Sequence, residues 1–245
     1  MLLIFFVFGV CLGSFATVLI NRLPLGEDFI LSRSRCPKCH KKLSPYELIP
    51  IFSWIFLKRE CKGCKSKISA IYIASEILIG FLAIFAYFID SNLILALLLV
   101  IIFTIFYALS IIDLRLKAVP NGLLMSGYFL AIIYAFISDM SNIIDSFTII
   151  GIMVILKSTL ILLHNNKGKN IEPMGDGDSI FIASMVAILG LEWGFIALFI
   201  AALIQLVIHL IKKDDRAIAF IPALFIGFIA ILSIKNFTNI NLGLI

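Results

Sequence analysis

The chain has 245 residues, of which 62% are hydrophobic and only 14% are charged, and its mean hydropathy is +1.12. Soluble domains average roughly 45–50% apolar and about 25% charged residues, so this composition excludes a water-soluble globule, a disordered chain and a small disulfide scaffold. The formal net charge is +5, but 11 of the 20 Lys and Arg residues fall between Arg22 and Lys67. Basic residues concentrated in one segment indicate which side of a membrane that segment lies on, rather than a basic surface spread over a nucleic-acid-binding domain. We therefore expect contact with membrane lipid and none with nucleic acid.

The apolar residues are grouped into stretches that suit membrane-spanning helices. A hydrocarbon core about 30 Å thick requires roughly 20 residues of helix. The runs are continuous, whereas a transmembrane β-barrel would alternate polar and apolar residues. We therefore expect an all-α, polytopic membrane protein with about eight transmembrane helices. In chain order, the predicted spans are residues 1–20, 70–89, 93–112, 123–137, 143–163, 179–189, 193–211 and 217–233.

The positions of Lys and Arg predict the orientation, because cytoplasmic loops hold the excess of basic residues. With the N-terminus outside, 18 of the 20 basic residues lie on the cytoplasmic side. They are the 11 in the first loop, Arg115 and Lys117, Lys167 and Lys169, and Lys212, Lys213 and Arg216. The stretch 179–189 is the weak element, since it is roughly 16 Å long as a helix and could be re-entrant. We expect it to cross, because otherwise the last basic cluster would lie outside.

Four cysteines stand in the long polar loop that follows the first span. Cys36 and Cys39 form one C-x-x-C pair, and Cys61 and Cys64 form a second. Four thiolates in two such pairs suit a tetrahedral zinc site with no open catalytic position, so we expect structural zinc. Disulfides or free thiols are the alternative, and a cytoplasmic location disfavours disulfides. A loop this small and polar needs the folding free energy that zinc supplies.

Two aspartates lie at the ends of predicted spans, where ionisable groups are costly and often functional. Asp113 ends the third span, and Asp178 closes the sequence Gly175-Asp176-Gly177-Asp178 and opens the sixth. The predicted topology puts both at the cytoplasmic face. Two carboxylates at one depth can share a proton, activate water and protonate a leaving amine, as in an aspartic protease. The other interpretation is that Asp178 simply caps its helix.

These motifs, taken together and in order, resemble the bacterial type IV prepilin peptidases, which are G-x-G-D membrane aspartic proteases. The likeness covers nearly the whole chain. It rests on Gly13-Ser14-Phe15, Val18, Asn21-Arg22-Leu23-Pro24, Cys36-Pro37-Lys38-Cys39, Leu48-Ile49-Pro50, the second cysteine pair, Ile68 through Tyr72 to Glu76, Ile112-Asp113 with Pro120, and Gly175-Asp176-Gly177-Asp178.

The resemblance implies that Asp113 and Asp178 are the catalytic residues. It implies as substrate a prepilin or pseudopilin whose short basic leader is cut on the cytoplasmic side of the bacterial inner membrane. It also implies that S-adenosylmethionine serves as cofactor if the enzyme N-methylates the new amino terminus. Two positions depart from the family pattern: Ile180 stands where Lys is usual, and the variable position of G-x-G-D is the acidic Asp176.

The apolar and polar stretches divide the chain into a first transmembrane helix (1–20), a cytoplasmic cysteine-bearing loop (21–69) and a multi-helix transmembrane catalytic domain (70–245). Two other functions fit the residues. One is an ion-coupled transporter that uses the Asp cluster, and the other is an inactive scaffold of the pilus or secretion machinery. Two further charges lie inside spans, and we expect Glu76 and Lys157 to pair or Glu76 to face the catalytic cavity. The alternative for Lys157 is that its side chain extends to the membrane interface, and this is the more common behaviour of a lysine in a span.

Overall fold

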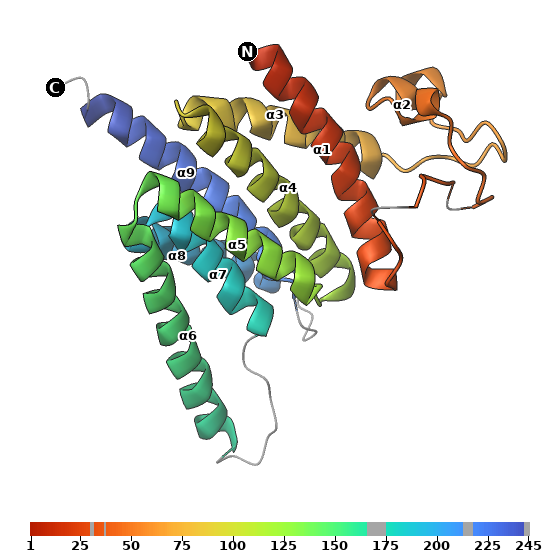
Figure 1. Cartoon of the computed structure of the whole chain (residues 1–245). Coiled ribbons are helices and arrows are strands. Elements are labelled where there is room, and N and C mark those ends of the chain that lie inside the picture. The colour runs from red at the N-terminus through yellow and green to blue at the C-terminus, as the bar shows by residue number, and fades with distance from the viewer. Residues whose placement is uncertain (30–31, 37, 166–174, 213–217, 243–245) are drawn as a thin grey trace. The chain divides into compact units, whose positions relative to one another are not determined.

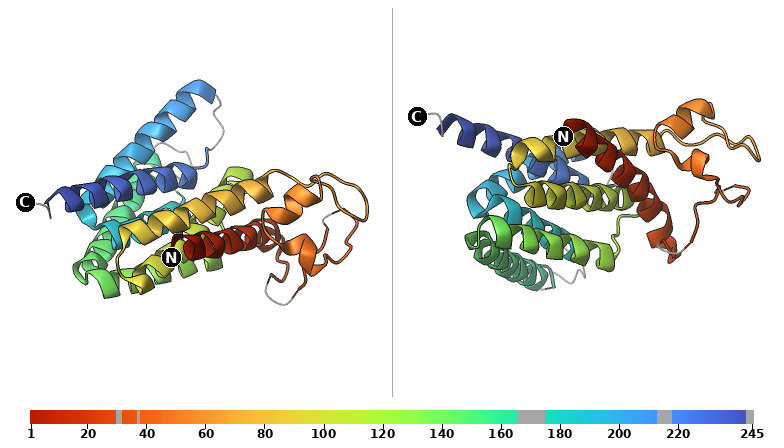
Figure 2. Two further views of the ribbon diagram at one scale, coloured as in Figure 1. Left: turned by 90° about the horizontal axis from the view of Figure 1, so that it is seen from above. Right: turned by 45° about the horizontal axis from the view of Figure 1, so that its top comes forward.

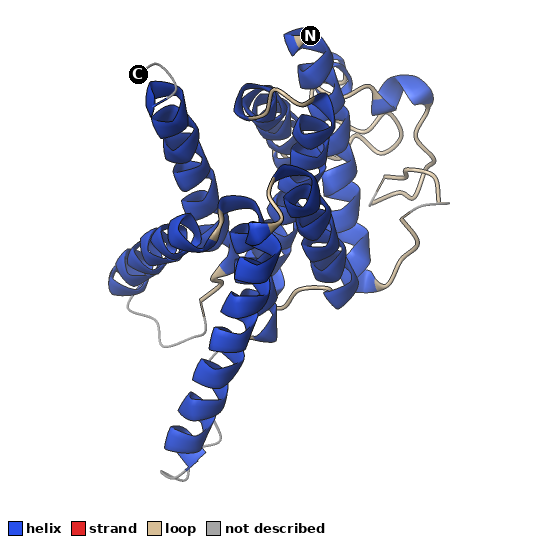
Figure 3. Ribbon diagram, turned by 60° about the vertical axis from the view of Figure 1, so that its left-hand side comes forward, coloured by secondary structure: helices blue, strands red, loops and turns tan. Residues whose placement is uncertain are grey.

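The computed structural model describes residues 1–29, 32–36, 38–165, 175–212 and 218–242. Across these ranges the chain forms helices joined by loops, and the only strand-like pairing consists of two isolated bridges in the cysteine-bearing loop (Figure 3). The all-α prediction is therefore confirmed. Lys167, Lys169, Lys213 and Arg216, on which the orientation prediction partly depends, lie outside the described residues.

The chain divides into two compact units, residues 1–104 and 105–245. The first unit begins with a long helix, continues through a loop with short helical turns, and returns in a second long helix (Figure 1). Its elements are α1 (Leu2–Arg22), η1 (Leu23–Leu25), η2 (Pro45–Leu48), α2 (Phe52–Phe56), α3 (Ile71–Ile89) and the first half of α4 (Leu93–Leu116).

Two glycines of α1 allow it to cross closely over α3 (Figure 2). A Cβ atom added at Gly9 would lie 2.6 Å from the Ile79 carbonyl oxygen, and one at Gly13 would lie 2.6 Å from that of Ser75. The glycines are four residues apart, so they lie on one face of α1. Membrane helices gain stability from this close backbone approach, since hydrophobic burial does not drive them together in lipid.

In the second unit, one short helix packs against several longer ones. The elements after α4 are α5 (Asn121–Ser138), α6 (Ser141–Asn165), α7 (Asp176–Leu189), α8 (Leu191–Lys212) and α9 (Ile221–Leu242). Helix α7 contacts α5, α6, α8 and α9, and every residue from Phe181 to Leu189 is buried. The ring of Phe181 lies 4.4 Å from that of Phe106 in α4. Because α7 is enclosed, its first turn is held in a fixed place.

Seven of the described helices are long and apolar enough to cross a membrane. They correspond to seven of the eight predicted spans, with ends that differ by a few residues. The exception is α7, which has 14 residues and covers the predicted stretch 179–189. A helix of this length spans about 21 Å, less than a full hydrocarbon core.

Candidate active site

Asp113 lies in the last turn of α4 and is 8% exposed. Its Oδ2 accepts a hydrogen bond from the backbone N–H of Ile221 at 3.1 Å, and the backbone N–H of Phe220 donates to the same carboxyl group. Ile221 is the first residue of α9. The carboxyl group therefore stands at the positive end of a helix dipole, where unpaired N–H groups favour an anion.

Asp178 is the third residue of α7 and is half-buried. Its carboxyl group accepts a hydrogen bond from the backbone N–H of Gly175, the residue that precedes the helix. Its own N–H donates to the Gly175 carbonyl oxygen at 3.2 Å. This reciprocal arrangement resembles a capping box, in which the third helical residue reaches back to the N-cap. Asp178 thus caps its helix and is also fixed in direction.

The two carboxyl groups, 65 positions apart in the sequence, come together in the second unit. Asp178 lies close enough to Asp113 for their negative charges to interact. Two carboxyl groups that share one site can hold a single proton between them. One protonated and one ionised carboxyl group supply the acid and the base that hydrolysis of a peptide bond needs.

The glycines of the motif leave room for this geometry. A Cβ atom at Gly177 would lie 2.8 Å from Cγ2 of Val119, in the segment that joins α4 to α5. A Cβ atom at Gly175 would lie 3.2 Å from Oδ2 of Asp178. Side chains at these positions would push the start of α7 away from the α4–α5 connection, or displace the carboxyl group itself. The motif is therefore explained by close packing around Asp178.

Asp176 does not join the pair. Its side chain is 88% exposed and forms an ion pair with Lys157 of α6. Glu76 accepts a hydrogen bond from the backbone N–H of Ile51 at 2.6 Å and another from the Ser14 side chain. The predicted pairing of Glu76 with Lys157 is therefore wrong. Depth along a span was the only evidence for it, and depth does not determine which neighbours a side chain meets.

The four loop cysteines gather as predicted. Their sulfur atoms all lie within 4.8 Å of one another, and the Cys36–Cys64 and Cys39–Cys61 pairs are both 3.9 Å apart. A tetrahedral zinc ion with Zn–S bonds of about 2.3 Å requires sulfurs about 3.8 Å apart. The cluster therefore fits one metal ion. The fifth cysteine, Cys11, lies in α1.

Each cysteine pair stands in the same small turn, a repeat that the sequence analysis missed. In the first, the N–H of His40 donates to the Cys36 carbonyl oxygen; in the second, the N–H of Lys65 donates to that of Cys61. His40 and Lys65 both have positive φ angles, of 54° and 58°. The bridges Arg35–Lys42 and Glu60–Lys67 close the two turns equivalently. The shared signal is a basic or polar residue directly after each C-x-x-C.

Backbone hydrogen bonds stabilise the thiolate form of Cys36 in the first turn. The N–H of Cys39, followed by that of Lys38, donates to the Cys36 sulfur and lowers the pKa of this thiol to about 6, against the opposing effect of its burial. Metal ligation requires the thiolate form. At Cys36 the turn therefore favours the ionisation state that a metal ion would bind.

Two family models match successive parts of this chain. The profile of the Bacterial Peptidase A24 N-terminal domain matches residues 7–89, and that of the Type IV leader peptidase family matches residues 98–210. The prepilin leader peptidase/N-methyltransferase of Dichelobacter nodosus is 32% identical over 237 residues, which cover 83% of this chain and 81% of that protein. The chain belongs to the type IV leader peptidase family.

Other type IV leader peptidases are similar over different extents. The Vibrio cholerae prepilin leader peptidase/N-methyltransferase is 29% identical over 78% of this chain and 79% of its own length. The Myxococcus xanthus protein of the same name is 47% identical over 77 residues, which cover 31% of this chain but only 23% of that protein. No solved structure gives a significant match. Asp113 and Asp178 fall in the Type IV leader peptidase segment, and the four clustered cysteines fall in the N-terminal domain segment.

Proposed function

We propose that this chain is an aspartic endopeptidase of the bacterial inner membrane that removes the short basic leader from type IV prepilin-like proteins, with Asp113 and Asp178 as its catalytic residues. The main support for this proposal is that these two carboxyl groups, which come from different helices, interact in one partly buried site. The family assignment supports the peptidase class, and the printed names of the relatives support the prepilin substrate.

The proposed reaction divides acid and base work between the two carboxyl groups. The ionised one takes a proton from a water molecule as the water oxygen attacks the scissile carbonyl carbon. The protonated one donates its proton toward the carbonyl oxygen. When the C–N bond breaks, one carboxyl group donates a proton to the leaving amine and the other takes a proton from a hydroxyl of the tetrahedral diol, so the pair ends the cycle with the single proton that it held at the start.

The proposed substrate suits the acidic character of the site itself, where Asp113 and Asp178 lie. A basic leader followed by an apolar helix can keep its charges in water while the helix lies among the spans. We place the site at the cytoplasmic face because residues 21–69, which join the first two spans, hold 11 basic residues, and Asp113 ends the third span on the same side of the membrane. The exposed Asp176 adds negative charge there, and the Lys that is usual at the position of Ile180 is absent.

We propose that zinc binds Cys36, Cys39, Cys61 and Cys64 and stabilises the loop. The four-sulfur geometry supports this, and it leaves no ligand position for catalysis. N-methylation with S-adenosylmethionine is supported by the names of the relatives alone. Mass spectrometry of the mature pilin after incubation with S-adenosylmethionine tests it, since transfer adds the mass of one methyl group.

Cleavage of a prepilin by the purified protein in detergent tests the peptidase proposal. We expect loss of the leader on a gel with the unmodified chain and strongly slowed cleavage with Asp113→Asn or Asp178→Asn. Asp176→Asn is the matched control, because it removes a nearby carboxylate that lies outside the pair, and it should keep most of the activity. Cleavage that stays near the unmodified rate in both catalytic variants would reject the assignment, and no cleavage by the unmodified chain would favour the scaffold interpretation.

A further inference from the structure

The cysteine-bearing loop exposes a group of large apolar side chains outside every spanning helix. Phe56 is 79% exposed and Phe52 is 58% exposed, and their rings stack 6.3 Å apart on one side of α2. We call the group the apolar patch. Its members are Tyr46, Leu48, Ile49, Phe52, Ile55 and Phe56. An exposed apolar cluster of this kind marks a surface that contacts another molecule or a membrane.

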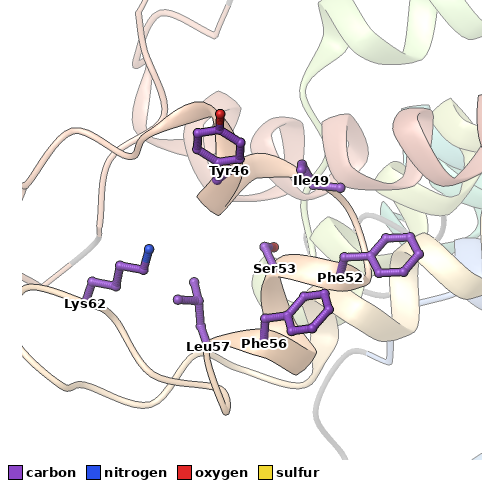
Figure 4. Close-up of a pocket in the computed structure, with 7 residues that line it drawn as sticks. All are labelled: Tyr46, Ile49, Phe52, Ser53, Phe56, Leu57 and Lys62. Atoms are coloured by element: carbon purple, nitrogen blue, oxygen red, sulfur yellow. The ribbon is translucent and has the colours of Figure 1, made fainter.

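The patch borders a shallow hollow with one basic residue at its rim. Figure 4 shows Tyr46, Ile49, Phe52 and Phe56 around this space of about 380 Å³, with the amine of Lys62 directed toward it. Lys58 and Arg59 follow Leu57, the C-cap residue of α2. The surface therefore combines apolar side chains with adjacent positive charge, as interfacial membrane segments do.

A buried hydrogen bond holds the patch at the level where α3 begins. The N–H of Ile51, between Ile49 and α2, donates to Oε2 of Glu76 at 2.6 Å. Glu76 is five residues, or about 7 Å, into α3, and helical side chains lean toward the N-terminus. Ile51 is thus held beside the first turn of α3, which is long and apolar enough to span a membrane. The patch lies where the polar boundary of the bilayer is expected.

The net charge of the loop indicates which kind of partner this surface binds. Residues 21–69 hold 11 basic residues against 4 acidic ones, Glu27, Asp28, Glu47 and Glu60. The apolar helix of a protein substrate could cover the apolar side chains of the patch, but it would not neutralise the positive charge of the loop. Anionic lipid suits both the apolar patch and the positive charge, since its headgroups attract basic residues and aromatic rings insert among its acyl chains.

We propose that the apolar patch inserts into the boundary between headgroups and acyl chains of an anionic bilayer, with Lys58, Arg59 and Lys62 at the headgroups. The loop is then a membrane-anchored element, fixed at its centre by Glu76 and by the lipid surface on its outer face. This proposal needs only that α1 and α3 cross a membrane. It is independent of proteolysis, so it can fail while the peptidase proposal stands.

Quenching of tryptophan fluorescence by brominated lipid tests the insertion. The full chain carries Trp54→Phe and Trp193→Phe, which remove its two tryptophans, together with Phe56→Trp. It is reconstituted into vesicles of phosphatidylethanolamine and phosphatidylglycerol, with or without bromine on the acyl chains. We expect bromine to remove most of the emission and the spectrum to be blue-shifted relative to a water-exposed tryptophan. Metal content checks that the loop has folded.

The matched control is Phe81→Trp in the same background, because Phe81 is 60% exposed on α3 and should face lipid. Its emission should be quenched in every brominated vesicle. Replacing phosphatidylglycerol by phosphatidylcholine should weaken quenching for Phe56→Trp and leave Phe81→Trp unchanged. Water-like, unquenched emission from Phe56→Trp alongside quenched Phe81→Trp would overturn the proposal, as would equal quenching of Phe56→Trp in both lipid mixtures.

Discussion

Asp113 and Asp178 reach their positions by the same local means. Each carboxyl group accepts a hydrogen bond from backbone N–H at the start of a helix, Asp113 from α9 and Asp178 from α7. A side chain held by rigid backbone loses little rotamer freedom during the reaction, which is the usual requirement for catalytic groups. The sequence marks both aspartates and Gly175, the donor to Asp178, but not the donors to Asp113, since Phe220 and Ile221 are ordinary apolar residues without a motif.

Glu76 is the residue whose role changed most between sequence and structure. Its carboxylate accepts the N–H of Ile51, whose φ of 62° is unusual for a β-branched residue. We expect Glu76→Ala to destabilise the protein by roughly 1–3 kcal/mol, because it removes the buried acceptor of the half-buried Ile51 N–H. Thermal unfolding in detergent measures this.

Glu76→Gln is the companion variant, since its amide oxygen can still accept the Ile51 N–H. Its unfolding temperature should lie close to that of the unmodified chain. If Gln is as destabilising as Ala, the charge of Glu76 matters more than its hydrogen bond, and the anchoring role is wrong.

At the scale of elements, the contact between α1 and α3 depends on backbone approach. We expect Gly13→Ala to lower stability by about 1–3 kcal/mol, because its Cβ atom would lie 2.6 Å from the Ser75 carbonyl oxygen and 2.7 Å from Cα of Glu76. Gly151→Ala is the control, since nothing lies within 4 Å of a Cβ atom there. Unfolding temperatures compare the two, and equal effects would contradict the packing argument.

The paired cysteine turns make a prediction about metal. Cys61→Ser should lose most of the bound zinc, measured by elemental analysis of the purified protein, because it removes one of four converging sulfurs. Cys11→Ser should keep the full amount, since Cys11 lies in α1, outside the cluster. Zinc retained by Cys61→Ser, or absent from the unmodified chain, would contradict the assignment.

For the whole molecule, hydropathy predicted the helices well because a bilayer leaves the backbone no other hydrogen-bonded form than a helix or a closed barrel. Seven of the eight predicted stretches are helices of spanning length. The cysteine cluster was predictable too, because its ligands are local and regularly spaced. What the sequence could not supply were contacts between helices, such as the pairing of Lys157 with Asp176 and the enclosure of α7.

The orientation of the chain is a separate prediction. We expect an N-terminal tag to be digested by protease added outside intact spheroplasts, and a tag in the loop of residues 21–69 to resist until the membrane is opened. The reason is the excess of basic residues in that loop. The reverse pattern would move Asp113 and Asp178 to the outer face and exclude a cytoplasmic cleavage site.

A double-mutant cycle on prepilin cleavage tests most directly whether the two aspartates act as one unit. Residues that share one proton and one water are not additive, so Asp113→Asn combined with Asp178→Asn should reduce the rate no further than either change alone. Losses that multiply, with each single variant keeping a measurable share of the activity, would show that the two carboxyl groups act independently and would contradict a shared hydrolytic site.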